Sequence, residues 1–167
     1  WLRPVDVPED KIILYVHGGG YVAGSCTDHR GFVASLAKRL GYAALTYDYR
    51  LAPEHPYPAA VEDSLAVYGA LLERHRPEDI LLAGESAGGG LTLALLFALK
   101  QAQRPMPCAA VTISPWTDLT CASPAYRTRN ARSVAPRDSW TVFSHHYAAG
   151  QDRRDPLMSP SFGDPAG

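Results

Sequence analysis

The chain has 167 residues, of which 46% are hydrophobic and 20% charged, and its formal net charge is −1 at pH 7. This length and composition are typical of one soluble globular domain, and the balanced charge gives no reason to expect nucleic acid or an anionic membrane as a partner. The longest apolar stretch, around LTLALLFAL, is much shorter than the roughly 20 residues that cross a bilayer, so no membrane span is expected.

Four short apolar runs predict buried strands, because they are almost continuously hydrophobic, as parallel strands covered on both faces are. They are KIILYVH (11–17), YAALTYDY (42–49), DILLAG (79–84) and AAVTIS (109–114). Helical patterns lie between them: Phe32, Leu36 and Leu40 before Gly41, then Val61, Leu65, Tyr68 and Leu72 before Pro77, then the apolar stretch 87–101. The alternation predicts an α/β fold with a parallel sheet and right-handed crossovers.

The amino-acid composition changes after Ser114, and residues 115–138 are rich in Pro, Arg and Ser. Asp138 or Ser139 could cap a short helix that carries Trp140, Phe143 and Tyr147 at helical spacing, facing the core or a substrate. We expect residues 115–150 to form a lid or substrate-facing insertion within one partial domain, 1–167.

The stretch GESAGGGL, residues 84–91, contains a G-x-S-x-G motif centred on Ser86. A predicted strand leads into the serine and an apolar helix leads out, so the motif predicts a tight turn that presents a nucleophile. Gly84 and Gly88 would be needed because a Cβ at either position would collide as strand and helix approach. The N–H of Ala87 would point toward a developing oxyanion. The alternative is a glycine-rich helix start with Ser86 as its N-cap.

A second motif, HGGGY (17–21), ends the first predicted strand. Its glycines leave backbone N–H groups free to turn toward a ligand, which suits an oxyanion hole. A phosphate-binding loop is the competing interpretation, but the stretch lacks both the G-K-[ST] ending and the Rossmann glycine spacing. Acyl transfer fits better.

With HGGGYVAGS, YDYRLAPEHPYPAA, GESAGGGL, SPWTDLT and DPLMSP in this order, the chain resembles the hormone-sensitive lipase branch (bacterial family IV) of the α/β-hydrolases. The resemblance implies a carboxylesterase for short-chain acyl esters, with Ser86 as nucleophile and an oxyanion hole formed by Gly19, Gly20 and Ala87. It implies that His17 orients the loop without transferring protons. Relative to the family, the chain resembles a central fragment, strands 3 to 6 with their helices.

The stretch YDYRLAPEHPYPAA is interpreted as structural support, because three prolines fix a loop between a strand end and a helix start. Arg50, with Asp48 or Glu54 nearby, is expected to form a buried hydrogen-bonded pair that holds this loop under the active site.

A serine nucleophile needs a histidine base and an acid that orients it. By the resemblance, both lie beyond residue 167, so this chain alone is expected to be nearly inactive. His145 or His146 acting with Asp118 is a formal alternative, since catalytic geometry does not follow sequence order. No H-E-x-x-H motif is present, and we expect no metal and no cofactor.

Two rival functions remain open: a non-catalytic small-molecule receptor on the same scaffold, and an amidase or deacetylase that uses the same serine. The strands are expected in the spatial order second, first, third, fourth, with both edges uncovered, which predicts self-association. Three scattered cysteines without metal-site spacing (Cys26, Cys108 and Cys121) suggest reduced thiols and a cytoplasmic location.

Overall fold

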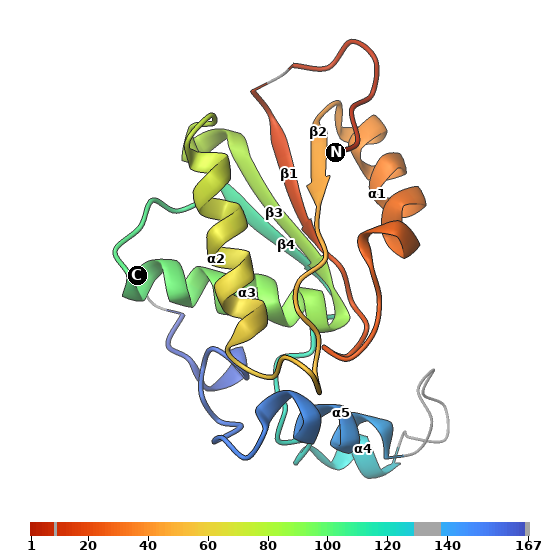
Figure 1. The fold of residues 1–167 in the computed structure, drawn as a ribbon, viewed down its shortest axis with the longest axis vertical. Helices are drawn as coiled ribbons and strands as arrows, with labels where there is room; N and C mark the ends of the chain where they lie inside the picture. The colour runs from red at the N-terminus through yellow and green to blue at the C-terminus, as the bar shows by residue number, and fades with distance from the viewer. Residues whose placement is uncertain (9, 129–137, 166–167) are drawn as a thin grey trace.

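The computed structural model describes residues 1–8, 10–128 and 138–165. Its centre is a parallel sheet of β1 (Ile12–Val16), β2 (Ala43–Thr46), β3 (Ile80–Glu85) and β4 (Ala109–Ile113). In the described residues these strands lie in the order β2-β1-β3-β4, which confirms the predicted α/β fold and the predicted order (Figure 1).

Helices cover both faces of the sheet (Figure 1). α1 (Cys26–Leu40) lies on one face, while α2 (Ala59–Leu72) and α3 (Ser86–Gln101) lie on the other. Short 3-10 helices span Pro77–Asp79 and Pro160–Phe162. α4 (Pro124–Thr128) and α5 (Ser139–Ala148) lie beyond the carboxyl ends of the strands, where ligand sites of open α/β sheets are found.

Strand β1 shows why the apolar runs lack alternation. Ile12 and Leu14 pack in the cluster on the α2 and α3 side, whereas Ile13 and Tyr15 pack in the cluster on the α1 side. All of these side chains are fully buried, so a central parallel strand must be apolar at every position.

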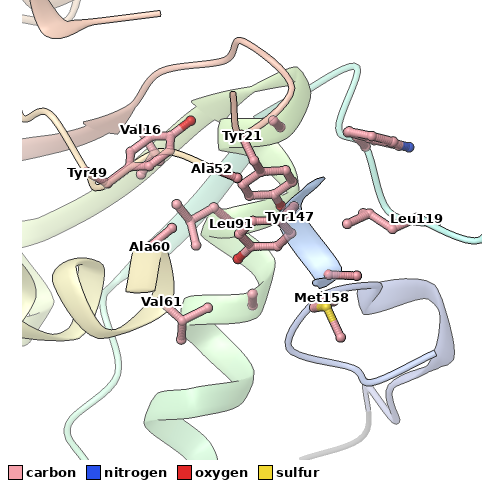
Figure 2. Close-up of a cluster of buried hydrophobic side chains, with 14 of the residues drawn as sticks. Val16, Tyr21, Tyr49, Ala52, Ala60, Val61, Leu91, Leu119, Tyr147 and Met158 are labelled. Carbon is pink, nitrogen blue, oxygen red and sulfur yellow. The ribbon is translucent and has the colours of Figure 1, made fainter. Parts of the chain in front are cut away.

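A third cluster fills the space between the carboxyl end of the sheet and α5. The ring of Tyr147 on α5 stacks on Tyr21 with 3.9 Å between centroids and an interplanar angle of 11°. Figure 2 shows these two rings side by side within the cluster. Trp140 and Phe143 are partly buried against the same cluster. The predicted helix and the core-facing side of its aromatic residues are therefore confirmed.

The sheet edges differ from the expectation in two ways. β4 was expected to be buried, but Val111 and Ile113 are 52% and 44% exposed because no described helix covers that face of the strand. The β2 edge was expected to be uncovered, but Leu2 forms an antiparallel bridge with Ala44 through two 2.8 Å backbone hydrogen bonds.

The face of α1 that packs on the sheet differs from the face that the sequence pattern predicts. Phe32 and Leu40 are 50% and 46% exposed, while Val33 and Ala37 are buried against the sheet. Smaller side chains let the helix approach the strands closely, and Phe32 instead lies beside the ring of Tyr15 at 5.7 Å. The predicted stop at Gly41 is confirmed, since this residue caps the helix with a φ of 67°.

The expected partners of Arg50 were wrong. Its guanidinium is partly exposed and pairs with Asp63 and Glu62 at the start of α2, at 2.9 Å each. Asp48 instead accepts a 2.6 Å hydrogen bond from the N–H of Cys26 at the start of α1. Sequence proximity suggested the wrong acids, because the loop folds back onto the first turn of α2.

Gly88→Ala tests the close approach of α3 to β1. An added Cβ would overlap the backbone carbonyls of Val16 and His17, which cannot rotate away, so we expect a loss of about 3 kcal/mol in the free energy of unfolding. Gly31→Ala is the matched control, because a Cβ there meets nothing within 4 Å on the exposed face of α1. The free energy of unfolding of Gly31→Ala should rise by about 0.5–1 kcal/mol. Urea unfolding measures both variants, and equal changes in the free energy of unfolding would contradict the close packing of α3 on β1.

Candidate active site

Ser86 lies at the turn between β3 and α3 and is half-buried. Its φ is 53°, in the left-handed region that non-glycine residues rarely adopt. Such a conformation costs on the order of 1–3 kcal/mol and persists where the surroundings impose it, most often at functional sites. The N-cap of α3 is Glu85, so the alternative of Ser86 as an N-cap is wrong.

Gly84 and Gly88, two residues before and after Ser86, have no room for a side chain, the first because of α3 and the second because of the end of β1. A Cβ at Gly84 would lie 2.5 Å from both the carbonyl oxygen of Gly88 and the hydroxyl of Thr92 on α3. A Cβ at Gly88 would overlap the carbonyls at the end of β1. The first turn of α3 therefore packs directly on the start of the loop that carries the HGGG motif (residues 17–20), called the HGGG loop below.

The HGGG loop leaves the sheet beside the serine, because Val16 pairs with Gly84 in the register of β1 and β3. Gly19 and Gly20 have φ values of 124° and 66°, conformations that favour glycine. A Cβ on Gly20 would lie 2.6 Å from the ring of Phe143 on α5. The structure thus brings Ser86, Ala87, Gly19 and Gly20 to one end of the sheet, while their oxyanion roles stay predictions.

His17 is fully buried within this loop. Its Nδ1 lies 2.7 Å from the carbonyl oxygen of Gly18, and its ring stacks on Tyr49 at 4.3 Å between centroids. Tyr49 also donates a 2.9 Å hydrogen bond to the carbonyl of His17. Burial lowers the pKa of His17, so the ring is neutral and its Nδ1–H donates to Gly18. A neutral ring held in this way suits an orienting role.

Sequence reasoning alone does not single out Glu85, yet its carboxylate contacts the loop. The N–H of Gly18 donates a 2.7 Å hydrogen bond to Oε1 of Glu85. Nε2 of His29 on α1 lies 3.1 Å from the same oxygen. The available signal was a carboxylate at the end of an otherwise apolar strand, immediately before the serine.

Trp116 holds the backbone of the turn from the other side. Its N–H donates a 2.8 Å hydrogen bond to the carbonyl of Ser86, and its indole donates to the hydroxyl of Tyr126 at 3.0 Å. A Cβ on Gly90 would overlap the Trp116 carbonyl, so α3 also rests on this segment.

The described residues do not bring the formal alternative triad together. The carboxylate of Asp118 accepts hydrogen bonds from the N–H and hydroxyl of Thr120, at 2.8 and 2.5 Å. His145 and His146 are exposed, and Nδ1 of His145 lies 2.7 Å from the Thr141 carbonyl of its own helix. No hydrogen bond or ion pair joins either histidine to Asp118 among these residues.

Two structural features are absent from the described ranges 1–8, 10–128 and 138–165. These ranges contain no cluster of three or more His, Cys, Asp or Glu side chains that could hold a metal ion. Within the same ranges, no helix has the length and hydrophobicity that crossing a bilayer requires. Cys26, Cys108 and Cys121 carry free thiols. Residues 129–137, part of the predicted lid, lie outside these ranges.

Comparison with known proteins identifies the class. A family model described as the alpha/beta hydrolase fold matches residues 13–167, so the chain belongs to this family. An acetyl-hydrolase of Streptomyces hygroscopicus is 44% identical over the whole chain, and an esterase of Acinetobacter venetianus is 36% identical over 92% of it. The chain spans 56% and 52% of these two relatives, about half of their length.

Solved structures agree with this assignment. The crystal structure titled EstE5-PMSF superposes with a TM-score of 0.93 at 42% identity, and the chain covers 56% of it. An esterase described as belonging to the bacterial hormone-sensitive lipase family has the same TM-score at 40% identity. The resemblance to that branch is therefore confirmed at the level of family and fold.

The buried ring of His17 predicts a pH dependence of stability. Because burial lowers its pKa in the folded state, the unfolded chain takes up this proton at higher pH. The stabilisation is fully present above the ordinary value of 6.5 and is lost as the pH falls below it. Urea unfolding between about pH 7.5 and about pH 5 should show this loss.

A variant of His17 and a control without a titratable group test this. His17→Asn should weaken the pH dependence of the unfolding free energy, whereas Ser35→Ala, on the exposed face of α1, should leave it as in the wild type. An unchanged pH dependence in His17→Asn would contradict the neutral buried ring.

Proposed function

We propose that the protein is a serine carboxylesterase that hydrolyses short-chain acyl esters through an acyl-enzyme on Ser86. The observation that carries the proposal is the strained Ser86 turn, whose helix rests on the carbonyls that begin the HGGG loop. This packing keeps a hydroxyl and a run of glycine amides at one end of the sheet, the two parts that acyl transfer requires.

The reaction would proceed in two halves. A general base takes the proton of the Ser86 hydroxyl as its oxygen bonds to the ester carbonyl carbon, and the carbonyl oxygen becomes an oxyanion. The N–H groups of Gly19, Gly20 and Ala87 would stabilise this charge, each by about 3 kcal/mol. The intermediate expels the alcohol, which takes the proton from the base, and water then cleaves the acyl-enzyme in the same manner to release the acid.

The base and its acid are proposed to lie outside the described residues. Support comes from the described histidines after Ser86, which are exposed and unconnected to Asp118. By this proposal the 167-residue chain alone is nearly inactive, and the protein expressed from its complete reading frame is the form in which activity should be measured.

The proposed substrate class draws on the names of relatives. They include an acetyl-hydrolase and, at 33% identity, an ethyl acetate hydrolase of Pseudomonas putida. Phe143 borders the proposed oxyanion amides, since a Cβ on Gly20 would lie 2.6 Å from its ring. Reduced thiols at the three cysteines support a proposed cytoplasmic location.

Ser86→Ala tests the nucleophile in the protein expressed from its complete reading frame. We expect serine-dependent hydrolysis of a short-chain ester to fall by about a millionfold, as when a catalytic serine is removed from a serine hydrolase. PMSF, which sulfonylates activated serines, should add one group to the wild type by intact mass and none to the variant.

Ser35→Ala is the matched control, because this serine lies exposed on α1 and its hydroxyl donates a 3.0 Å hydrogen bond to the Gly31 carbonyl of the same helix. It should keep wild-type activity and labelling. Full activity in Ser86→Ala would end the proposal, and small-molecule binding without turnover in the wild type would favour the receptor.

We also propose that the 167-residue chain self-associates through β4. This strand ends the sheet in the described residues, and its Val111 and Ile113 are exposed, a combination that invites strand pairing. Val111→Lys should lower the sedimentation coefficient toward that of a monomer. Val5→Lys, at a residue 87% exposed outside the sheet, should not. A monomeric wild type across micromolar concentrations would contradict this.

A further inference from the structure

Glu85, the residue before Ser86, has one carboxylate oxygen, Oε1, that contacts both Gly18 and His29. Glu85 occupies a position of β3 whose side chain faces α1, as Ala83 does two residues earlier in the α1-side cluster. Gly84, between them, faces α3 instead. The carboxylate is therefore directed away from the helix that Ser86 begins and toward the HGGG loop and His29.

The carboxylate holds the loop by its backbone. The N–H of Gly18 donates to Oε1 at 2.7 Å, and a Cβ added to Gly18 would overlap the carboxylate, so the two groups are in direct contact. The carbonyl of the same residue accepts from the buried ring of His17 at 2.7 Å. Both polar groups of Gly18 are thus fixed, one by each neighbouring side chain.

The carboxylate is itself held in place from α1. Nε2 of His29 lies 3.1 Å from Oε1, and its Nδ1 lies 3.0 Å from the carbonyl of Ser25, the N-cap of that helix. The His29 ring also stacks on His17 with 5.5 Å between centroids. The helix start, the loop and the serine turn are therefore connected through one carboxylate, which is partly exposed at 29%.

We propose that Glu85 is a positioning residue that sets the oxyanion amides relative to Ser86, with His29 supporting it. Gly18 immediately precedes Gly19 and Gly20, whose amides are the proposed donors. Hydrogen-bond donors act on a transition state only when they are pre-positioned, and a shift of about 1 Å can lower turnover about a hundredfold. Glu85 itself touches neither substrate nor the reacting atoms.

This inference rests on the proposed esterase function. The test compares Glu85→Ala, which removes the acceptor, with Glu85→Gln, which keeps one carbonyl oxygen for the Gly18 N–H. In the protein expressed from its complete reading frame, Glu85→Ala should lower kcat by about 10–100-fold with little change in KM. Glu85→Gln should stay within a few-fold of the wild type. Glu73→Ala, on an exposed carboxylate at the end of α2, is the control and should change neither constant.

Two further readouts distinguish positioning from general structural damage. A trifluoromethyl ketone, whose adduct with Ser86 carries an oxyanion, should lose affinity for Glu85→Ala in proportion to the loss in kcat/KM. Backbone amides of residues 18–20 should exchange hydrogen faster in Glu85→Ala than in Glu85→Gln. His29→Leu should show the same pattern more weakly.

The outcomes separate this inference from the proposed function. Wild-type kcat in Glu85→Ala would overturn the inference, and so would an equal loss of kcat in Glu85→Gln and Glu85→Ala. If the wild type shows no Ser86-dependent hydrolysis, the proposed function fails, and amide exchange alone then tests whether Glu85 holds the loop. Should Glu85→Ala not fold, protection of the Gly18 amide in the wild type decides: strand-like protection supports the inference, and rapid exchange overturns it.

Discussion

The architecture of the site depends on one close approach, that of the first turn of α3 to the carboxyl end of β1. Only a hydrogen at the α-carbon of Gly88 lets the helix rest on the Val16 and His17 carbonyls. That contact places the positive end of the helix dipole over the start of the HGGG loop. Two residues before Gly88, Ser86 makes the turn from strand to helix with a φ of 53°.

The surrounding contacts secure this approach from several sides. Trp116 holds the Ser86 carbonyl, Tyr49 holds the His17 carbonyl, and Glu85 holds the Gly18 amide. Each of these bonds fixes backbone rather than a reactive side chain. Catalysis by backbone amides needs this kind of support, because a peptide group can be aimed only by fixing the chain on both sides of it.

Much of the fold follows from the sequence because its signals are local. The apolar runs and the helix stop at Gly41 report residues whose environment is set by neighbours in the chain or by burial on both faces. The strand order follows from the general rules of parallel sheets and from the family resemblance. The motifs HGGGY and GESAGGGL are local signals too, because a run of glycines shows directly in the sequence where the backbone is free of side chains.

The parts that the sequence did not predict depend on long-range packing. The apolar run of β4 predicts burial, but its exposure depends on what lies beside the strand, which the run does not encode. On α1, Val33 and Ala37 face the sheet although the larger Phe32 and Leu40 form the more evident stripe. Arg50 pairs across a loop, and Glu85 meets a glycine 67 positions away in the sequence. No short-range pattern marks such partners.

The proposed chemistry requires that the Ser86 oxygen and the amides of the HGGG loop act on the same carbonyl group of the substrate. A crystal structure of the protein, expressed from its complete reading frame and reacted with an alkyl phosphonate ester, measures this directly. We expect phosphorus bonded to Ser86, with one phosphonyl oxygen about 2.7–3.1 Å from the amide nitrogens of Gly19, Gly20 and Ala87. A phosphonyl oxygen directed away from those amides, or phosphorus bonded to another residue, would contradict the proposed chemistry.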